Sequence, residues 1–256
     1  MSTVYLITGA NRGLGLGLVK ALLTRPSTTI IASVRNEEAS QCLQSSLSSI
    51  TPADSSTIHI ITLSFPLSPT TTPSQLLSTL TTALPSISHI DVLIANAGFA
   101  TPMTPALTTT AEDLRLSFET NTISPLLIFQ AFHPLLKKAK AGPPKLIMMS
   151  SSVGSITAQE PFPGGAYGAS RAAGNWLLRA IHLQHEAEGL VAVALHPGWV
   201  RTRAGEFVAS EWGFGEGAPL ESVERSVSGI LEVVDGATRE SVGGEFVTYK
   251  GEKLPW

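Results

Sequence analysis

A short apolar run near the start of the chain leads directly into a glycine-rich turn, and this junction restricts the fold more than any other feature. Val4–Ile7 is predicted to be a buried strand, and Gly9, Gly13 and Gly15 follow it. Glycine permits a tight turn, lets the backbone approach a bound anion without a Cβ in the way, and lets a helix pack closely on a strand. The helix predicted over Leu14–Leu23 directs its free N–H groups toward the same space. This order of elements predicts a site for a phosphate-bearing ligand.

Short apolar runs and longer helical stretches then alternate to the end of the chain. Several of the runs are apolar at successive positions, as expected for strands buried on both faces. We therefore predict an α/β fold, a single Rossmann-type doubly wound domain over residues 1–256 with about seven mostly parallel strands flanked by helices. Strands are predicted at Val4–Ile7, Thr29–Val34, Ile58–Leu63, Val92–Ala95, Lys145–Met149, Leu190–Leu195 and Glu245–Thr248. Helices are predicted at Leu14–Leu23, Ser74–Leu84, Ala111–Lys140, Ala166–Glu188 and Leu220–Val234.

Proline and serine mark the expected breaks in this pattern. The long helix is expected to break near Pro125 and again near Pro134, because proline interrupts helical hydrogen bonding. The Ser-, Thr- and Pro-rich stretches at Ser45–Ser56 and Pro66–Pro73 are predicted to be solvated loops.

Residues 203–219 have a different composition, with glycines placed among Phe207, Trp212 and Phe214. Glycine provides mobility and the aromatic rings provide contact surface, so this stretch is predicted to be a lid loop over the substrate. An ordinary surface loop remains the alternative.

Composition excludes several classes of protein. The 256 residues are 43% hydrophobic and 14% charged, which suits one large domain with a sizeable core, and the net charge of −3 gives no basic surface for nucleic acid. The one cysteine, Cys42, excludes an intrachain disulfide and is expected to be at least half-buried. No His/Asp/Glu cluster has metal-ligand spacing, so no metal is expected. Without a signal-peptide pattern or an apolar run near ~20 residues, we expect a soluble cytoplasmic protein.

The glycine turn has the spacing Gly-x-x-x-Gly-x-Gly after Thr8, and in this it resembles the cofactor motif of the short-chain dehydrogenase/reductase family. The residues of the turn that would contact the cofactor are Gly9, Asn11, Arg12, Gly13, Leu14 and Gly15. Two further segments extend the resemblance. Asn96-Ala97-Gly98 is similar to the family motif that shapes the adenine-ribose side of the site. Pro197-Gly198-Trp199-Val200-Arg201-Thr202 is similar to the segment that holds the nicotinamide amide, through Pro197, Gly198, the Val200 backbone and the Thr202 hydroxyl.

The end of the second predicted strand indicates which dinucleotide is bound. NAD sites usually carry an acid there, whereas this chain has Arg35, whose planar cation can pair with a 2′-phosphate. Arg12, before the second glycine of the turn, is a second candidate cation. Both together favour NADPH/NADP+. Relatives often place an acid after the third strand to hold adenine; here Ser64-Phe65 stands instead, so Ser64 or the backbone is expected to make that contact.

Tyr167 and Arg171 are the predicted proton-transfer pair. Tyr167 matches the tyrosine of the family's Tyr-x-x-x-Lys motif, but arginine replaces the lysine. One helical turn places residue 171 on the same face as residue 167, so the guanidinium can favour the phenolate and can also bond the nicotinamide ribose. Arginine cannot lose a proton, so a relay through water or a ribose hydroxyl would replace the one through lysine.

Two more polar residues complete the candidate site. Ser151 resembles the family's substrate-polarising serine, with Ser150 and Ser152 as alternatives one residue away. Asn121 resembles the helix asparagine that holds a water beside the basic residue. His196, which precedes Pro197, is expected to be a packing residue.

The final residues, Gly243 to Leu254-Pro255-Trp256, are similar to a fungal subgroup around norsolorinic acid ketoreductase. This resemblance implies a bulky, apolar small-molecule substrate such as a polyketide. Membership of the wider family implies a homodimer or homotetramer, while the charge and hydropathy of the chain give no reason to expect a nucleic-acid or membrane partner. Three hypotheses stay open. The first is an NADPH-dependent ketoreductase, and the second is a same-fold NADP(H)-binding cyclase or isomerase. The third is a non-catalytic NADP(H) sensor, which would not need the Asn121/Ser151/Tyr167 set.

Overall fold

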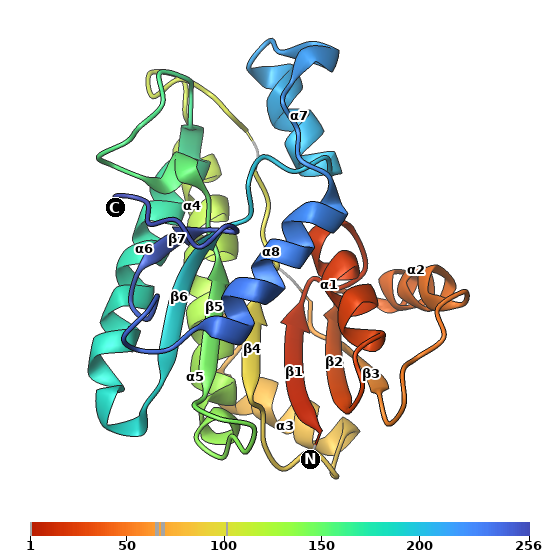
Figure 1. The fold of residues 1–256 in the computed structure, drawn as a ribbon. Helices are drawn as coiled ribbons and strands as arrows, with labels where there is room; N and C mark the ends of the chain where they lie inside the picture. Colours follow the sequence, from red (N-terminus) through yellow and green to blue (C-terminus); the bar gives the residue numbers. More distant parts are fainter. Residues whose placement is uncertain (1, 65–66, 68–69, 101) are drawn as a thin grey trace.

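The computed structural model describes residues 2–64, 67, 70–100 and 102–256, and these form one twisted sheet with helices on both faces (Figure 1). The sheet has seven strands in the order β3-β2-β1-β4-β5-β6-β7, and every neighbouring pair is parallel. The predicted fold class is therefore confirmed. The strands are β1 (Thr3–Thr8), β2 (Thr28–Val34), β3 (Thr57–Thr62), β4 (Val92–Ala95), β5 (Lys145–Met149), β6 (Val191–His196) and β7 (Phe246–Thr248).

Alternation of side chains along the strands divides the interior into two cores. In β1, Tyr5 and Ile7 belong to one apolar cluster, whereas Val4 and Leu6 belong to the other. The first core lies under α1 (Gly13–Leu23), α2 (Glu37–Leu47) and α8 (Val223–Gly236). The second lies under α3 (Pro73–Ala83), α5 (Ser124–Leu136) and α6 (Gly165–Gln184). Because both faces of the sheet are covered, the strands are apolar at successive positions.

The strand order reverses direction beside β1. The chain moves outward from β1 to β2 and β3, and then returns to add β4 on the other side. At such a switch point the loops after the two central strands diverge and leave a crevice at the carboxyl edge of the sheet. The glycine turn after β1 and the Asn96 segment after β4 both lie at this edge.

Two parts of the chain that we expected to be loops contain helices. Helix α2 (Glu37–Leu47) was not predicted, and it includes the beginning of the expected loop Ser45–Ser56. Asn36 caps this helix by accepting a hydrogen bond from Ala39 N. Cys42, expected to be at least half-buried, is exposed on the outer side of α2.

The expected lid loop is also partly helical, which corrects its description as a loop. Residues Arg203–Glu211 form α7, and a short 3-10 turn follows at Gly215–Gly217. Thr202 caps α7 through its hydroxyl, which accepts a hydrogen bond from Gly205 N at 3.2 Å. In Figure 1, α7 stands at the top of the molecule, above the carboxyl edge of the sheet.

The long predicted helix is interrupted once. It consists of α4 (Ala111–Phe118), a π-helical turn at Glu119–Ile123, and α5, which starts one residue before Pro125. Pro134 causes no second break, because it lies inside α5, only two residues before the helix ends. In the predicted loop Pro66–Pro73, residues 66, 68 and 69 lie outside the described part of the chain. No helix among the described residues is long and apolar enough to cross a membrane.

Candidate active site

The glycine turn after β1 has the backbone shape that its sequence predicts. Gly9 and Gly13 have φ angles of +68° and +53°, in the left-handed region that favours glycine. A Cβ on Gly15 would lie 2.2 Å from the carbonyl oxygen of Gly9, so only glycine allows α1 to start this close to β1. The turn is therefore a cradle that leaves the N-terminal N–H groups of α1 free for an anion.

Asn96 and Thr8 fasten the loop after β4 to this turn. The Asn96 side-chain amide donates to the carbonyl oxygens of Thr8 and Gly9, at 2.9 and 3.3 Å. In return, the Thr8 hydroxyl accepts from the backbone N–H groups of Asn96 and Ala97, at 3.0 and 2.9 Å. The loops after β1 and β4 are thus held together by side chains at the switch point.

Arg12 and Arg35 are both exposed at this edge. Neither side chain has a hydrogen bond or ion pair with another described residue, so both cations are available to a ligand. The Ser64 hydroxyl donates to the carbonyl oxygen of Arg35 at 3.2 Å, which ties the ends of β2 and β3 together. Phe65, named with Ser64 as the replacement for the adenine-contacting acid, lies outside the described residues.

Close packing brings the serine turn after β5 against α6. Ser151 precedes a 3-10 turn at Ser152–Gly154, and Tyr167 lies in the first turn of α6; both are buried. A Cβ on Gly154 would lie 2.7 Å from the Cβ of Arg171, and one on Gly168 would lie 2.9 Å from the carbonyl oxygen of Val153. These two glycines allow the turn and the helix to touch, which places Ser151 and Tyr167 at the same edge of the sheet.

Arg171 lies one helical turn further on, with its guanidinium over the face of the tyrosine ring. Its guanidinium carbon is 5.1 Å from the centroid of the Tyr167 ring, and its Nη1 donates to the carbonyl oxygen of Met149 at 2.7 Å. The side chain is buried, and its Nε has no hydrogen-bond partner among the described residues. The site therefore contains a fixed positive charge with an unused buried donor at Nε.

Asn121 occupies the π-helical turn and faces the same region. Its side-chain amide donates to Phe99 O and to Ser170 Oγ, both at 3.1 Å, while its Oδ1 accepts from Phe99 N at 3.2 Å. The amide thus fixes the backbone beyond Asn96-Ala97-Gly98. A Cβ on Gly98 would lie 2.5 Å from Nη2 of Arg171 and 3.0 Å from Oδ1 of Asn121, so these three residues converge.

His196, expected to be a packing residue, supports the serine turn. Its Nδ1 accepts a hydrogen bond from Ser152 N at 3.2 Å, which requires an unprotonated Nδ1. Burial lowers the pKa of His196 to about 4, so the ring is neutral at physiological pH.

The loop after β6 lies directly across from the glycine turn. A Cβ on Gly13 would meet the Thr202 methyl carbon at 3.3 Å. The Thr202 hydroxyl, predicted to hold the nicotinamide amide, caps α7 and lies 3.4 Å from the Val200 carbonyl oxygen. Pro197 accepts from Ser226 Oγ at 2.6 Å, and Gly198, with φ of +85°, packs on the Tyr249 ring. This arrangement fixes the loop at the edge of the crevice.

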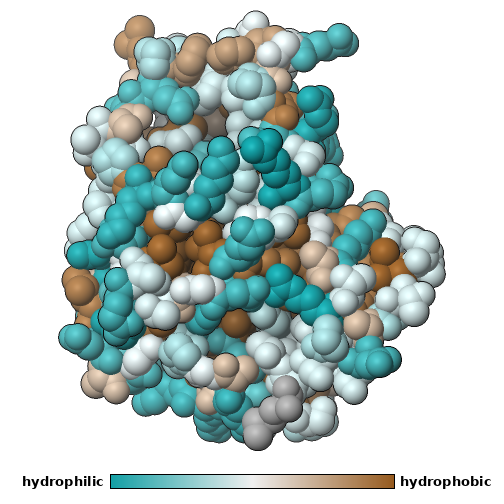
Figure 2. All heavy atoms as spheres, viewed as in Figure 1, coloured by the Kyte–Doolittle hydropathy of each residue, from teal (hydrophilic) through white to brown (hydrophobic). Residues whose placement is uncertain are grey.

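An aromatic cluster forms a wall above Tyr167. Trp212 stacks on Phe162 at 4.9 Å between centroids, and Trp199 meets both Trp212 and Phe214 edge-on at 5.6 and 5.2 Å. Tyr167 packs with Met103 and Val208 in an apolar cluster that Trp199 and Trp212 adjoin. Phe207 is outside this wall, and Phe162 and Trp199 are members that the sequence pattern did not identify. Hydrophobic side chains are visible along the top of the molecule in Figure 2, where α7 stands in Figure 1.

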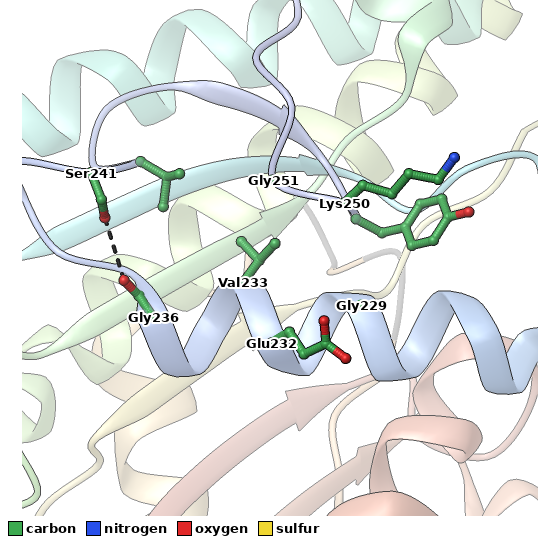
Figure 3. A pocket seen from close by; sticks show the side chains of 9 residues that line it. Gly229, Glu232, Val233, Gly236, Ser241, Lys250 and Gly251 are labelled. Carbon is green, nitrogen blue, oxygen red and sulfur yellow. Dashed lines mark hydrogen bonds between the residues drawn. The ribbon is translucent and has the colours of Figure 1, made fainter.

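Two other features lie away from these residues. The groove in Figure 3 runs between α8 and the turn after β7, where Glu232 and Lys250 line its sides.

A cluster of three side chains lies at the amino edge of the sheet. His133, His185 and Glu188 bring their ligand atoms within 4.8 Å of one another, although their spacing in the sequence did not indicate a cluster. One Glu188 oxygen lies 2.6 Å from His133 Nε2 and 3.1 Å from His185 Nδ1, and Lys137 pairs with the other oxygen. Glu188 is therefore the centre of a cluster held by hydrogen bonds with the two histidines and an ion pair with Lys137.

The fold and the site together indicate a class of protein, the nicotinamide-dependent oxidoreductases. The sheet is of the Rossmann type, its first turn is a glycine cradle, and a buried tyrosine is followed by a cation one helical turn later. The chain belongs to the short-chain dehydrogenase/reductase family, since the family model for short chain dehydrogenase matches residues 3–211. It is 38% identical over 262 residues to short-chain dehydrogenase RED3 of Pyricularia oryzae, covering 100% of this chain and 99% of that one. It is 37% identical to norsolorinic acid ketoreductase nor1 of Dothistroma septosporum, covering 99% and 92%.

A solved structure agrees with this assignment. NADPH-bound carbonyl reductase from chicken fatty liver superposes with a TM-score of 0.81 at 30% identity, and the match covers 100% of both chains. The predicted family and the similarity to ketoreductases of fungi are thus confirmed. The individual roles of the site residues remain predictions.

Proposed function

We propose that this protein is an NADPH-dependent reductase of ketones on bulky, apolar small molecules. The observation that carries the proposal is the Tyr167 phenol, packed on the turn of Ser151 and lying over the fixed guanidinium of Arg171. This combination provides a proton donor, a donor to the carbonyl oxygen and a positive charge at one place, which carbonyl reduction requires.

Each residue of the site has a distinct task in this reaction. When bound, the reduced nicotinamide supplies the hydride to the carbonyl carbon. Ser151 donates a hydrogen bond to the carbonyl oxygen, and Tyr167 transfers its phenolic proton to that oxygen as negative charge develops. Arg171 stabilises the resulting phenolate by its charge but keeps its own protons, so a new proton reaches Tyr167 from solvent or a ribose hydroxyl. Asn121 acts by holding the Phe99 backbone and thereby the floor of the crevice.

Charge at the adenine end of the crevice supports NADPH over NADH. Arg12 and Arg35 are exposed, lie on loops at the same edge, and have no partner among the described residues. A guanidinium can pair with the 2′-phosphate of NADPH through two parallel hydrogen bonds. The structure known for the carbonyl reductase from chicken fatty liver is NADPH-bound, which is consistent with the same preference here.

The aromatic wall supports a large, planar substrate. Phe162, Trp199, Trp212 and Phe214 form stacked and edge-on pairs beside Tyr167, and such faces bind flat apolar rings well. Two of these rings, on Trp212 and Phe214, lie in the 203–219 segment, which would cover a bound substrate. The relative nor1 is by name a ketoreductase of norsolorinic acid, so polycyclic aromatic ketones are the first compounds to test.

The test is NADPH consumption, followed by absorbance, with a panel of ketones from small aliphatic to polycyclic aromatic compounds. Tyr167→Phe removes only the proton donor and should abolish turnover, while the Kd for NADPH changes less than about twofold. Tyr5→Phe, at the amino end of β1, is the matched control and should retain activity. NADPH binding without consumption by any ketone would contradict the proposal.

One observation favours a second candidate, a cyclase or isomerase that binds NADP(H) without net redox chemistry. Arg171 cannot replace lysine in a proton relay, and its guanidinium is bonded to the Met149 carbonyl oxygen. Such an enzyme would convert its substrate while NADPH absorbance stays constant, so product analysis in the same assay separates the two functions.

A further inference from the structure

The last residues of the chain form a short hairpin with β7. Leu254 N donates to Phe246 O at 2.8 Å, and Val247 pairs with Lys253 as an antiparallel bridge. The Trp256 ring stacks on Phe246 with 5.7 Å between centroids and 26° between planes. Phe246 is fully buried in the second core. Residues 253–256, here called the tail, are therefore fixed to the edge of the sheet.

The tail presents the backbone oxygens of Pro255 and Trp256 to the loop that follows Ser151. The Ser155 hydroxyl donates to Pro255 O at 2.8 Å and accepts from Ala158 N at 3.0 Å. Thr157 N donates to Trp256 O at 2.9 Å. Ser155 is only 4% exposed, so breaking its bond to Pro255 would leave a buried hydroxyl without that partner. In Figure 1 the end of the chain runs beneath this loop.

The other end of the same loop carries part of the aromatic wall. Phe162 stacks on Trp212, and the Trp212 indole N–H donates to Pro163 O at 2.9 Å. The loop, residues 155–164, begins beside the turn of Ser151 and ends at α6, three residues before Tyr167. It therefore connects the tail at one end with α7 and the candidate substrate surface at the other.

We propose that the tail is a positioning element for this loop, and that Trp256 thereby sets which carbonyl substrates are accepted. The proposal rests on the proposed ketone reduction and extends it to specificity. Trp256 acts indirectly, since its ring packs on Phe246 and its backbone oxygen accepts a hydrogen bond from Thr157 N. Bulky aromatic ketones need the wall formed by Phe162 and Trp212, whereas small aliphatic ketones need only the groups at Ser151 and Tyr167.

The kinetic test uses Trp256→Ala and Ser155→Ala in the full chain, each assayed with a polycyclic aromatic ketone and a small aliphatic ketone. We expect the KM for the aromatic ketone to rise about tenfold in either variant, with kcat retained. The KM for the small ketone and the Kd for NADPH should change less than about twofold. Trp256→Phe keeps a ring on Phe246 and should restore the wild-type KM. An equal change in KM for both ketones, or no change for either, would overturn the proposal.

A second measurement separates failure of this proposal from failure of the ketoreductase function. Amide hydrogen exchange of residues 155–163 requires no substrate, so it remains informative if wild-type protein reduces no ketone. Trp256→Ala should accelerate exchange in this loop, including at Thr157, while exchange in β5 is unchanged. If loop exchange equals that of the wild type, the tail does not position the loop, whatever the enzyme catalyses.

Discussion

The guanidinium of Arg171 lies over the face of the Tyr167 ring, with 5.1 Å from its central carbon to the ring centroid. A bond from its Nη1 to the Met149 carbonyl oxygen holds the cation in that place. The positive charge is therefore built into the fold. In the proposed reaction it would stabilise a phenolate through electrostatics without taking part in proton exchange.

Replacing Arg171 tests whether charge or a proton relay matters. We expect Arg171→Met to lower kcat about 100-fold, because the developing charge on Tyr167 loses its cation. Arg171→Lys keeps the charge and adds a group that can exchange protons, so its kcat should equal or exceed that of the wild type. Steady-state assays of NADPH-linked ketone reduction give kcat for both variants, and circular dichroism checks that each variant is folded. A lysine variant as inactive as the methionine variant would show a role specific to the guanidinium.

Arg35→Ala tests the basis of cofactor choice. A charge-assisted hydrogen bond contributes about 1.5–3 kcal/mol, so the Kd for NADPH should rise about 10- to 100-fold. The Kd for NADH should not change, since it lacks the 2′-phosphate. Arg25→Ala is the control, because Arg25 is a half-exposed arginine paired with Asp235 instead. Fluorescence titration gives the Kd of each cofactor for the wild type and both variants. Equal weakening of NADPH and NADH binding by Arg35→Ala would rule out a phosphate contact.

His196→Asn should change how stability depends on pH. Burial lowers the pKa of His196 from 6.5 to about 4, so the folded state binds a proton less readily than the unfolded state. Its contribution to stability is complete above pH 6.5 and is lost as pH falls toward 4. Asparagine can still accept from Ser152 N but does not titrate. In urea unfolding experiments, the free energy of unfolding of the wild type should fall by on the order of 1–3 kcal/mol more than that of the variant between pH 6.5 and about 4. Parallel pH profiles of the two proteins would argue against this role.

Glu188→Gln should reduce sensitivity to strong acid. Burial alone would raise the pKa of Glu188, but hydrogen bonds from His133 and Lys137 outweigh it and lower the pKa to about 2. The stabilising contribution is present above the ordinary value of 4.5 and disappears as pH falls from 4.5 to about 2. We expect the variant to be less stable at pH 7 by about 1 kcal/mol, since the cluster is partly exposed.

The control for this experiment is Glu38→Gln, an exposed carboxyl in the first turn of α2. The free energy of unfolding of Glu38→Gln should stay close to that of the wild type at every pH. If Glu188→Gln and the wild type differ by the same amount at pH 7 and pH 2, the ion pairs do not stabilise the fold through ionised Glu188.

The sheet could be predicted from sequence because several strands are apolar at successive positions and turn residues separate the strands from the helices. Helix α2 could not, because only Ala39, Ser40 and Leu43 of its residues are buried, so its apolar stripe is short. Helix α7 was hidden by glycines and aromatic residues that are equally typical of a loop. The capping residue Thr202 was a usable signal for its start.

The candidate site was predictable where its residues lie in local motifs, as Gly9–Gly15 and Tyr167 do. The aromatic wall was only partly predictable, because Phe162, Trp199 and Trp212 meet from three separate segments. Likewise, no spacing in the sequence connects Ser155 with Pro255, whose contact spans 100 positions. Such pairs depend on the tertiary fold and leave no periodic signal.

The π-helical turn at Glu119–Ile123 contains Asn121, so the direction of the Asn121 side chain depends on the number of residues in this turn. Each residue of a regular helix rotates the next by about 100°. Deleting one residue there would let α4 and α5 join as one continuous, well-formed helix, yet the amide of Asn121 would face away from Phe99. We expect a protein shortened in this way to stay folded but to lose the hydrogen bonds between Asn121 and Phe99, so the deletion should impair the proposed activity more than the stability.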